Sequence, residues 1–212
     1  VSAKHAIVVK ADGTPTSAGI VSSYVWRTLD STPLRQSMAL TPLTQQMIVL
    51  KPNVFTMGHV VRLRCTARDS FAEDGYGEVS LRINVPPLGG SLTISPSNGM
   101  ALSTLFLIRA DFWLTEPENL PLTYRFFFIG LDEERTEMPL ARTQGQAIET
   151  ILPAGEANRS FTLDVGVEVI DLLNDFTRDV RQVQVLGISS DPGVFQEHAT
   201  AALTGTIDRF LR

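Results

Sequence analysis

The chain has 212 residues, of which 43% are apolar and 19% charged, and its formal net charge at pH 7 is −5. This balance excludes a disordered tail, the acidic charge argues against a nucleic-acid-binding face, and no apolar run approaches the ~20 residues of a membrane-spanning helix. Because the sequence begins at Val1 and shows no recognisable signal peptide, we expect a processed protein or a piece of a longer one.

The first 86 residues contain short segments rich in β-branched and aromatic residues, separated by Gly, Pro and Asn. Segments of this kind predict antiparallel strands of a β-sandwich and not a β/α fold. The expected strands cover residues 5–11, 20–29, 45–52, 59–70 and 77–85.

The last of these segments alternates strictly between apolar and polar residues, which indicates a strand with one wet face. The expected buried face consists of Val79, Leu81, Ile83 and Val85. The expected wet face consists of Glu78, Ser80, Arg82 and Asn84.

The chain has one cysteine, Cys65, which therefore cannot form an internal disulfide. It shares one face of its predicted strand with Val61, Leu63 and Ala67. We expect Cys65 to be a small buried hydrophobic side chain. An intermolecular disulfide or a reactive thiol is the alternative that the sequence leaves open.

A stiff boundary follows this strand. Pro86 and Pro87 cannot donate to a strand ladder, so the strand must stop there. Gly89 and Gly90 allow a sharp change of direction, and Ser95-Pro96 and Asn98-Gly99 are turn dipeptides. We therefore place a domain junction here, with a first sandwich over residues 1–86 and a second over residues 87–187, each near the ~100 residues of an immunoglobulin-sized module.

The second module repeats the strand pattern. The expected strands cover residues 91–95, 103–113, 122–130, 147–153, 161–170 and 180–187. In the segment 161–170, alternation predicts one apolar face and one polar face. The apolar face consists of Phe161, Leu163, Val165, Val167 and Val169, and the polar face of Thr162, Asp164 and Glu168. Residues 131–137 mix charges of both signs, and we expect an exposed loop or short helix there.

Residues 188–212 show no alternation, and apolar residues recur there at helical spacing. We expect a linker and an amphipathic helix, which either folds back on the second sandwich or opens a following domain. The predicted fold is thus all-β, with two tandem immunoglobulin/fibronectin-III-like β-sandwiches and a C-terminal helix.

Large aromatic residues occupy similar places in the two halves, which suggests a loose internal repeat of one module type. These residues are Tyr24, Trp26, Tyr124, Phe126 and Phe128. Aromatic side chains in the middle of sandwich strands usually belong to the core. Trp26 and Trp113 are the two tryptophans, and their exposure would instead favour a ligand-binding platform.

No pattern of a catalytic or metal site is found. His5, His59 and His198 are far apart, with no neighbouring His or Cys at metal-ligand spacing. Serine-hydrolase and nucleotide-binding motifs are absent. We therefore predict a non-enzyme with no catalytic, cofactor-binding or metal-binding residues.

Two acidic clusters leave one alternative open. Asp69, Glu73 and Asp74 form the first, and Glu116 and Glu118 the second. Acidic loops at sandwich ends can hold calcium, but without a D-x-D-x-D run solvated turns are the simpler interpretation.

One modification motif is present. Asn158-Arg159-Ser160 is an N-x-S glycosylation sequon in a turn before a predicted strand. In a secreted protein of a eukaryote, we expect Asn158 to be a glycosylation site.

A longer pattern runs from Asn84 to Phe126. It consists of Asn84, Pro86, Pro87, Gly89, Gly90, Ser91, Ser95, Pro96, Gly99, Ala101, Leu102, Thr104, Phe106, Trp113, Pro121, Leu122, Tyr124 and Phe126. This string resembles the REJ module, the receptor-for-egg-jelly domain of polycystin-1-like proteins. The resemblance covers most of residues 46–185, is weak over the first 45 residues and is absent from the predicted final helix.

The sequence departs from the REJ pattern at two cysteines. Leu92 stands where the family pattern has the Cys after G-G-S, and Ala110 stands near the position of a second Cys before the tryptophan. The resemblance implies that these two positions form a disulfide in the family. Since both cysteines are absent, we expect an apolar pair, and packing of Leu92 to recover part of the ~2–4 kcal/mol that a disulfide contributes.

The resemblance implies a non-catalytic extracellular segment of a large polycystin-1-like or REJ-like surface protein of cilia, flagella or gametes. The partners that it implies are other extracellular domains or proteins, and possible glycans, with a parent protein anchored in the membrane. A secreted carbohydrate- or ligand-binding β-sandwich module is the alternative function.

Overall fold

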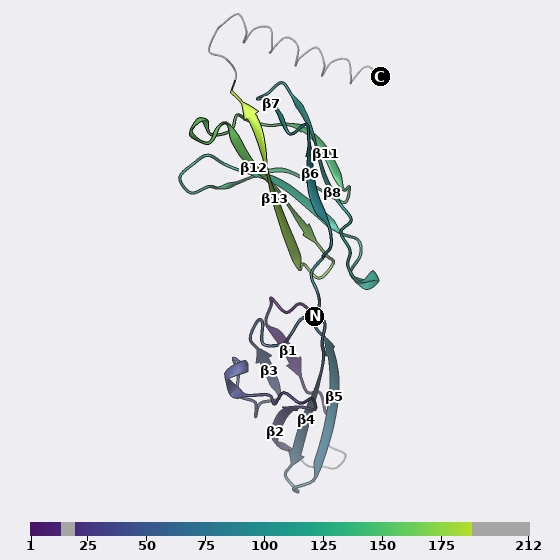
Figure 1. Cartoon of the computed structure of the whole chain (residues 1–212). Coiled ribbons are helices and arrows are strands. Elements are labelled where there is room, and N and C mark those ends of the chain that lie inside the picture. The colour runs from purple at the N-terminus through teal and green to yellow at the C-terminus, as the bar shows by residue number, and fades with distance from the viewer. Residues whose placement is uncertain (14–19, 188–212) are drawn as a thin grey trace, which may run out of the picture. The chain divides into compact units, whose positions relative to one another are not determined.

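The computed structural model describes residues 1–13 and 20–187. Its described part is built of β-strands with three single-turn 3₁₀ helices (Figure 1). Contacts between Cα atoms divide the chain into two compact units. Unit 1 comprises Val1–Val85 with Leu173–Asp175, and unit 2 comprises Pro86–Leu172 with the residues from Phe176 onward.

Unit 1 has two antiparallel sheets. Its elements are β1 (Ile7–Lys10), β2 (Val21–Thr28), the 3₁₀ helix η1 (Gln36–Met38), β3 (Met47–Leu50), β4 (Val60–Asp69) and β5 (Asp74–Arg82). One sheet has only β1 and β3, and the other has the order β2-β4-β5. The sheets therefore differ in width, and this difference leaves part of the wider sheet uncovered.

The core of unit 1 lies between these sheets. Ile48, Leu50 and Leu63 are fully buried at its centre, with Trp26 and Ile83 beside them. On β4, Val61, Leu63 and Cys65 are buried and Ala67 is half-buried, which confirms the predicted apolar face.

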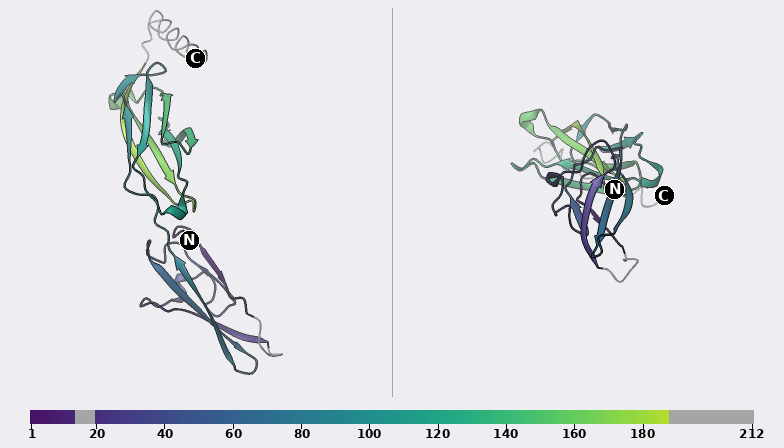
Figure 2. Two further views of the ribbon diagram at one scale, coloured as in Figure 1. Left: turned by 90° about the vertical axis from the view of Figure 1, so that its right-hand side faces the viewer. Right: turned by 90° about the horizontal axis from the view of Figure 1, so that it is seen from below.

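Unit 2 has one sheet of five strands and one of three, seen from two sides in Figure 2. Its strands are β6 (Ser91–Ser95), β7 (Asn98–Met100), β8 (Leu105–Asp111), β9 (Thr123–Ile129), β10 (Glu137–Thr143), β11 (Ala147–Ile151), β12 (Thr162–Ile170) and β13 (Phe176–Leu186). The 3₁₀ helices η2 (Pro117–Asn119) and η3 (Ala157–Arg159) lie between strands. The sheet orders are β10-β9-β12-β13-β7 and β11-β8-β6.

The core of unit 2 is formed by side chains from both sheets. Phe106 and Ile108 of β8 are fully buried, as is Phe126 of β9. On β12, Leu163, Val165, Val167 and Val169 are all fully buried, as alternation predicted. The all-β fold class is therefore confirmed.

The predicted faces of β5 are wrong at two positions. Val79 is 36% exposed although it was expected in the core. The narrow β1-β3 sheet does not cover this end of β5, because only two strands face it. Asn84, expected in solvent, is 3% exposed. It lies beyond the last residue of β5, where the alternation of the strand no longer applies, and its backbone N–H donates to the Val1 carbonyl.

The predicted wet face of β12 is also wrong at Glu168, which is 7% exposed. Gly166 on the same face is buried as well. The reason is tertiary: Phe127 of β9 packs on this outer face, and arginine side chains from neighbouring strands cover it.

Two further local predictions need correction. Asn98-Gly99 is not a turn but part of β7, which pairs in parallel with β13. The strand β10 was not predicted, because Pro139 and a register irregularity between Pro139 and Ala141 obscure its alternation. Residues 131–136 form the expected loop.

The predicted C-terminal helix in residues 188–212 lies outside the described residues. Among the residues that are described, no helix is long and apolar enough to cross a membrane.

Candidate functional site

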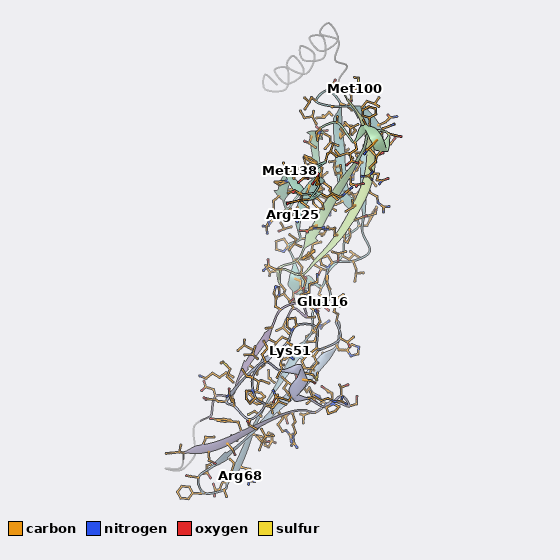
Figure 3. All side chains as sticks on the ribbon, turned by 90° about the vertical axis from the view of Figure 1, so that its left-hand side faces the viewer. Lys51, Arg68, Met100, Glu116, Arg125 and Met138 are labelled. Atoms are coloured by element: carbon orange, nitrogen blue, oxygen red, sulfur yellow. The ribbon has the colours of Figure 1, made fainter. Side chains whose placement is uncertain are left out.

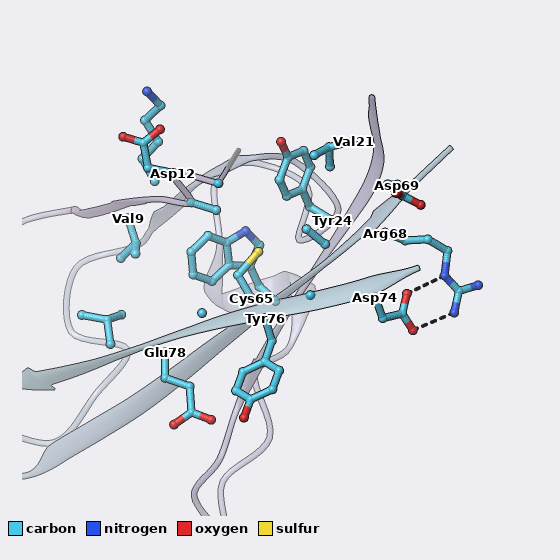
Figure 4. Close-up of a pocket in the computed structure, with 18 of the residues that line it drawn as sticks. Val9, Asp12, Val21, Tyr24, Cys65, Arg68, Asp69, Asp74, Tyr76 and Glu78 are labelled. Atoms are coloured by element: carbon cyan, nitrogen blue, oxygen red, sulfur yellow. Dashed lines mark hydrogen bonds and ion pairs between the residues drawn. The ribbon is translucent and has the colours of Figure 1, made fainter. Parts of the chain in front are cut away.

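Unit 1 contains an open groove between β1 and the β2-β4-β5 sheet. Its volume is about 640 Å³. It lies over the inner face of the β2-β4-β5 sheet, where this sheet extends beyond β1 (Figure 4). The side chains that form its apolar floor belong to Val9, Ala11, Tyr24, Trp26, Cys65, Ala67 and Val79.

The groove is open because β5 places glycines on its inner face. Gly75 and Gly77 pair with Ala67 and Cys65 of β4. A Cβ atom added at either glycine would have no heavy atom within 4 Å. Glycine inside a strand often marks a place where another group approaches the backbone, and the G-Y-G sequence at 75–77 is the signal that the sequence analysis passed over.

The residues that line the groove and its rim include more acidic than basic ones, although the side chain of Glu78 lies on the outer side of β5. Asp12, Asp69, Glu73, Asp74 and Glu78 stand against Lys10 and Arg68. Two hydrogen bonds, of 2.7 and 2.9 Å, join the Arg68 guanidinium to the Asp74 carboxylate, drawn as dashes in Figure 4. These bonds hold the pKa of Asp74 below its ordinary value.

The outer face of β5 is polar and exposed. Figure 4 shows Tyr76 and Glu78 on the side of the strand opposite to Cys65 and Tyr24. The Arg64 guanidinium lies 4.4 Å from the centre of the Tyr76 ring and donates to the Glu78 carboxylate. Tyr76 is 69% exposed, so this cation–π contact is a surface feature and leaves one face of the ring to solvent.

Cys65 is a free thiol, 5% exposed, at the groove floor. Burial raises the pKa of the thiol, and the opposing contribution of a backbone hydrogen bond from Val25 does not outweigh it. The thiol is therefore protonated at neutral pH and a poor nucleophile. This confirms the expectation of a small buried hydrophobic side chain.

Both tryptophans belong to the cores. Trp26 is 5% exposed and its indole N–H donates to the Gln45 carbonyl at 2.8 Å. Trp113 is 7% exposed and its ring lies against Gly90, where an added Cβ would approach the ring to 2.3 Å. Gly90 is thus required for close packing. Neither tryptophan forms an exposed platform.

The acidic clusters serve the local structure around them. Asp69 accepts hydrogen bonds from the backbone N–H groups of Phe71 and Glu73, and so closes the β4–β5 turn. Glu116 precedes η2, and Glu118 lies inside it. Among residues 1–13 and 20–187, no group of three or more His, Cys, Asp or Glu side chains is placed to hold a metal ion.

The two described histidines belong to different segments of unit 1. His5 contacts Ser2 through Nδ1 and the hydroxyl at 3.1 Å, and His59 lies directly before β4. His198 lies outside the described residues.

In unit 2, the outer sheet face carries an ionic cluster that the sequence analysis missed. Phe127 is fully buried between Gly166 and the guanidinium groups of Arg125 and Arg178, whose Cζ atoms lie 5.3 and 5.0 Å from the ring centre. Figure 3 labels Arg125 on this sheet. Both arginines donate to Glu168.

These ion pairs decide the protonation of Glu168. Burial alone would raise its pKa, but hydrogen bonds from Arg178 and Arg125 outweigh burial and hold the pKa of Glu168 below its ordinary value. Glu137 also pairs with both arginines. The charges are thus balanced within the cluster, which is typical of a structural network and not of a binding site in need of a ligand.

Asn158 lies within η3, and its side chain is exposed. Ser160, the third residue of the sequon, is exposed as well and adopts a left-handed backbone with φ of 55°. The expected surface position of the sequon is therefore present in unit 2.

The two positions of the missing cysteines face each other. Leu92 of β6 pairs directly with Ala110 of β8, and both are buried, at 3% and 0% exposure. The Leu92 N–H donates to the Asp179 carboxylate and the Ala110 N–H to the Gln146 carbonyl. The two residues therefore form a non-hydrogen-bonded pair, the closer type of antiparallel pair. The expected apolar contact is present at this position.

Similar solved structures include several proteins with immunoglobulin-type domains. The N-terminal eight Ig domains of Down Syndrome Cell Adhesion Molecule match at 14% identity and a TM-score of 0.43, over 88% of this chain and 23% of that one. Murine CEACAM1b matches at 10% identity and a TM-score of 0.36, over 89% and 95%. The extracellular domains 3–5 of Drosophila OTK match at 12% identity and a TM-score of 0.36, over 89% and 58%.

A protein-family model described as REJ domain matches residues 3–209. The match spans both units and includes the first 45 residues, where the sequence pattern was weak, so the resemblance extends further than the motifs indicated. Since it takes in nearly the whole sequence, the chain belongs to the REJ domain family.

Proposed function

We propose that this chain is a non-catalytic structural and interaction segment of a larger extracellular protein of polycystin-1-like or REJ-like type. The observation that carries this proposal is the family match over residues 3–209. The parent protein would be anchored in the membrane of a cilium, flagellum or gamete, and its partners would be other extracellular domains, proteins or glycans.

The side-chain chemistry supports a scaffold role. The tryptophans and the thiol pack in cores, and the described acidic residues of the β4–β5 turn and the Phe127 cluster are engaged in local hydrogen bonds and ion pairs. In the proposed arrangement, residues 1–86 and 87–187 are two sandwich modules in tandem. Residues 188–212 are a linker and helix that lead toward a following domain.

Glycosylation at Asn158 is part of this proposal. The exposed side chain in η3 is accessible to the modifying enzyme, as the sequon requires. Expression in a secreting eukaryotic cell should give a glycosidase-sensitive mass increase that Asn158→Gln abolishes. A mass unchanged by glycosidase in that system would count against Asn158 as a site.

The whole proposal is tested by the intact mass of the native protein from its own source, before and after glycosidase treatment. A species several times larger than the 23.3-kDa chain that shrinks on deglycosylation is the expected result. A bare 23.3-kDa species would overturn the proposal of a large surface glycoprotein.

The groove in unit 1 favours one second candidate, a secreted ligand-binding module. Its apolar floor and acidic rim suit a small ligand that has an apolar body and a positive charge. Gly77→Val should place a side chain in the groove, since no heavy atom lies within 4 Å of an added Cβ at this position. A ligand found by screening that binds the native chain and Gly77→Val equally well does not occupy the groove.

A further inference from the structure

The strand β5 has an open hydrogen-bonding edge. In the sheet order β2-β4-β5 it is an outer strand, and β4 is its neighbour. Asp74–Ser80 are all exposed, and Leu81 is half-buried. An outer strand of this length presents a row of backbone donors and acceptors to any second strand.

The direction of these backbone groups follows from the pairing with β4. At one end of the strand the Asp69 N–H donates to the Glu73 carbonyl, and at the other the Ile83 N–H donates to the His59 carbonyl. In antiparallel pairing, alternate residues point to the same side. The odd-numbered residues of β5 therefore bond to β4, and the even-numbered residues point outward.

Four of these outward residues have no backbone partner among the described residues: Asp74, Tyr76, Glu78 and Ser80. The fifth is different, because the Arg82 carbonyl accepts a hydrogen bond from the Val1 amino group at 2.8 Å. The open edge thus begins at Asp74 and ends at Ser80.

Three of the usual protections of an outer strand are missing from β5, although it carries the charged residues Asp74, Glu78 and Arg82. It contains neither proline nor lysine, and its register with β4 is unbroken from Asp74 to Arg82. The opposite outer strand β2 has an irregularity between Val21 and Ser23. Natural sheets use such irregularities, together with proline and lysine, to prevent pairing at their edges.

We propose that β5 pairs antiparallel with β5 of a second copy of this chain, with Gly77 on the two-fold axis. This register pairs Asp74 with Ser80 of the second copy and Tyr76 with Glu78 of the second copy. It uses all four open residues of both strands and no others. It also places Val79 of the second copy opposite Gly75, where the groove floor has open space for a side chain.

Charge selects this register over its neighbours. A shift of the axis to Tyr76 places Asp74 opposite Glu78 of the second copy, and a shift to Glu78 places two Glu78 side chains opposite each other. Like charges directly opposite in a sheet are destabilising. With the axis at Gly77, no acidic residue of β5 has an acidic residue opposite it, and Glu78 meets Tyr76, a hydrogen-bond donor. This complementarity with itself favours a second copy over an unrelated strand.

The inference goes beyond the proposed function, because it depends only on the described strands of unit 1. A chain that proves monomeric would overturn it and leave the proposal of a large surface glycoprotein untouched.

The test is disulfide crosslinking of the full 212-residue chain, with Cys65 first replaced by alanine because it pairs with Gly77 across β4 and β5. Cys65→Ala with Gly77→Cys places two thiols opposite each other at the axis. The matched control, Cys65→Ala with Gly75→Cys, places its thiol opposite Val79 instead. Both added side chains have open space, so both variants should fold.

Under mild oxidation, the Gly77→Cys variant should form a species of twice the chain mass at least several-fold faster than the Gly75→Cys variant. Equal rates, or faster crosslinking of the control, would overturn the register. A third variant tests the edge in a chain that should remain folded. Ser80→Pro removes an outward N–H that the fold does not use, so this variant should lose self-association when its mass is measured by sedimentation equilibrium. A native chain that sediments as a monomer would overturn the proposal. The same holds if the monomeric chain binds unrelated extended peptides at this edge.

Discussion

The pairing of Leu92 with Ala110 predicts that a disulfide absent from this chain can be introduced into unit 2. Leu92→Cys combined with Ala110→Cys places the two sulfur atoms on a non-hydrogen-bonded antiparallel pair. The Cα atoms of such pairs are about 4.5 Å apart, within the range that a disulfide requires.

The expected magnitude has two parts. Closing the loop between positions 92 and 110 is worth about 3 kcal/mol on the loop-entropy estimate. Shortening the buried Leu92 side chain costs about 2 kcal/mol, at the lower end of the cost of truncating a core leucine, because a sulfur atom remains. The oxidised variant should therefore be about 1 kcal/mol more stable than the native chain, and the reduced variant about 2 kcal/mol less stable.

The assay is denaturant unfolding of unit 2 with and without reductant, together with alkylation and mass measurement to count free thiols. One free thiol, Cys65, should remain in the oxidised variant. Leu92→Cys with Ile108→Cys is the matched control, since Ile108 lies on the same face but pairs with Ile94. Three free thiols in the Leu92/Ala110 variant after oxidation, or a disulfide formed equally well in the control, would refute the register of β6 with β8.

Three other predictions concern residues that the structure buries. Because the pKa of Glu168 is lowered in the folded chain, the ionised carboxylate stabilises the fold above its ordinary pKa of about 4.3, and this stabilisation is lost as the pH falls through the lower folded value. Glu168→Gln should therefore make the free energy of unfolding, measured with denaturant, less dependent on pH in this acid range. An unchanged pH dependence would contradict the role of Arg178. Gly166→Ala should lower the free energy of unfolding by about 1–3 kcal/mol, because an added Cβ would approach the Phe127 ring to 2.3 Å and overpack the site. An unchanged free energy of unfolding would show that the ring moves freely. Trp26→Ala should lower the stability of unit 1 by about 3–5 kcal/mol, as measured by tryptophan-independent circular dichroism, whereas a change below about 1 kcal/mol would contradict its core position.

The amino-acid sequence by itself determined the strand content and most of the inward-facing side chains. Alternation on β12 identified Leu163, Val165 and Val167 as core residues, and all are fully buried. This succeeds because the alternation of side chains in a strand is a local property of the extended backbone. The REJ motif string likewise depends on residue order alone, and it identified the family.

Only the tertiary structure decided which faces are covered. Val79 is exposed because the facing sheet has two strands, and Glu168 is buried because Phe127 and two arginines from other strands meet on its face. Coverage depends on the width and position of strands far away in the sequence, which no local pattern encodes. The open edge of β5 arises in the same way, since a strand becomes an edge through the absence of a neighbour among the described strands and not through its own residues.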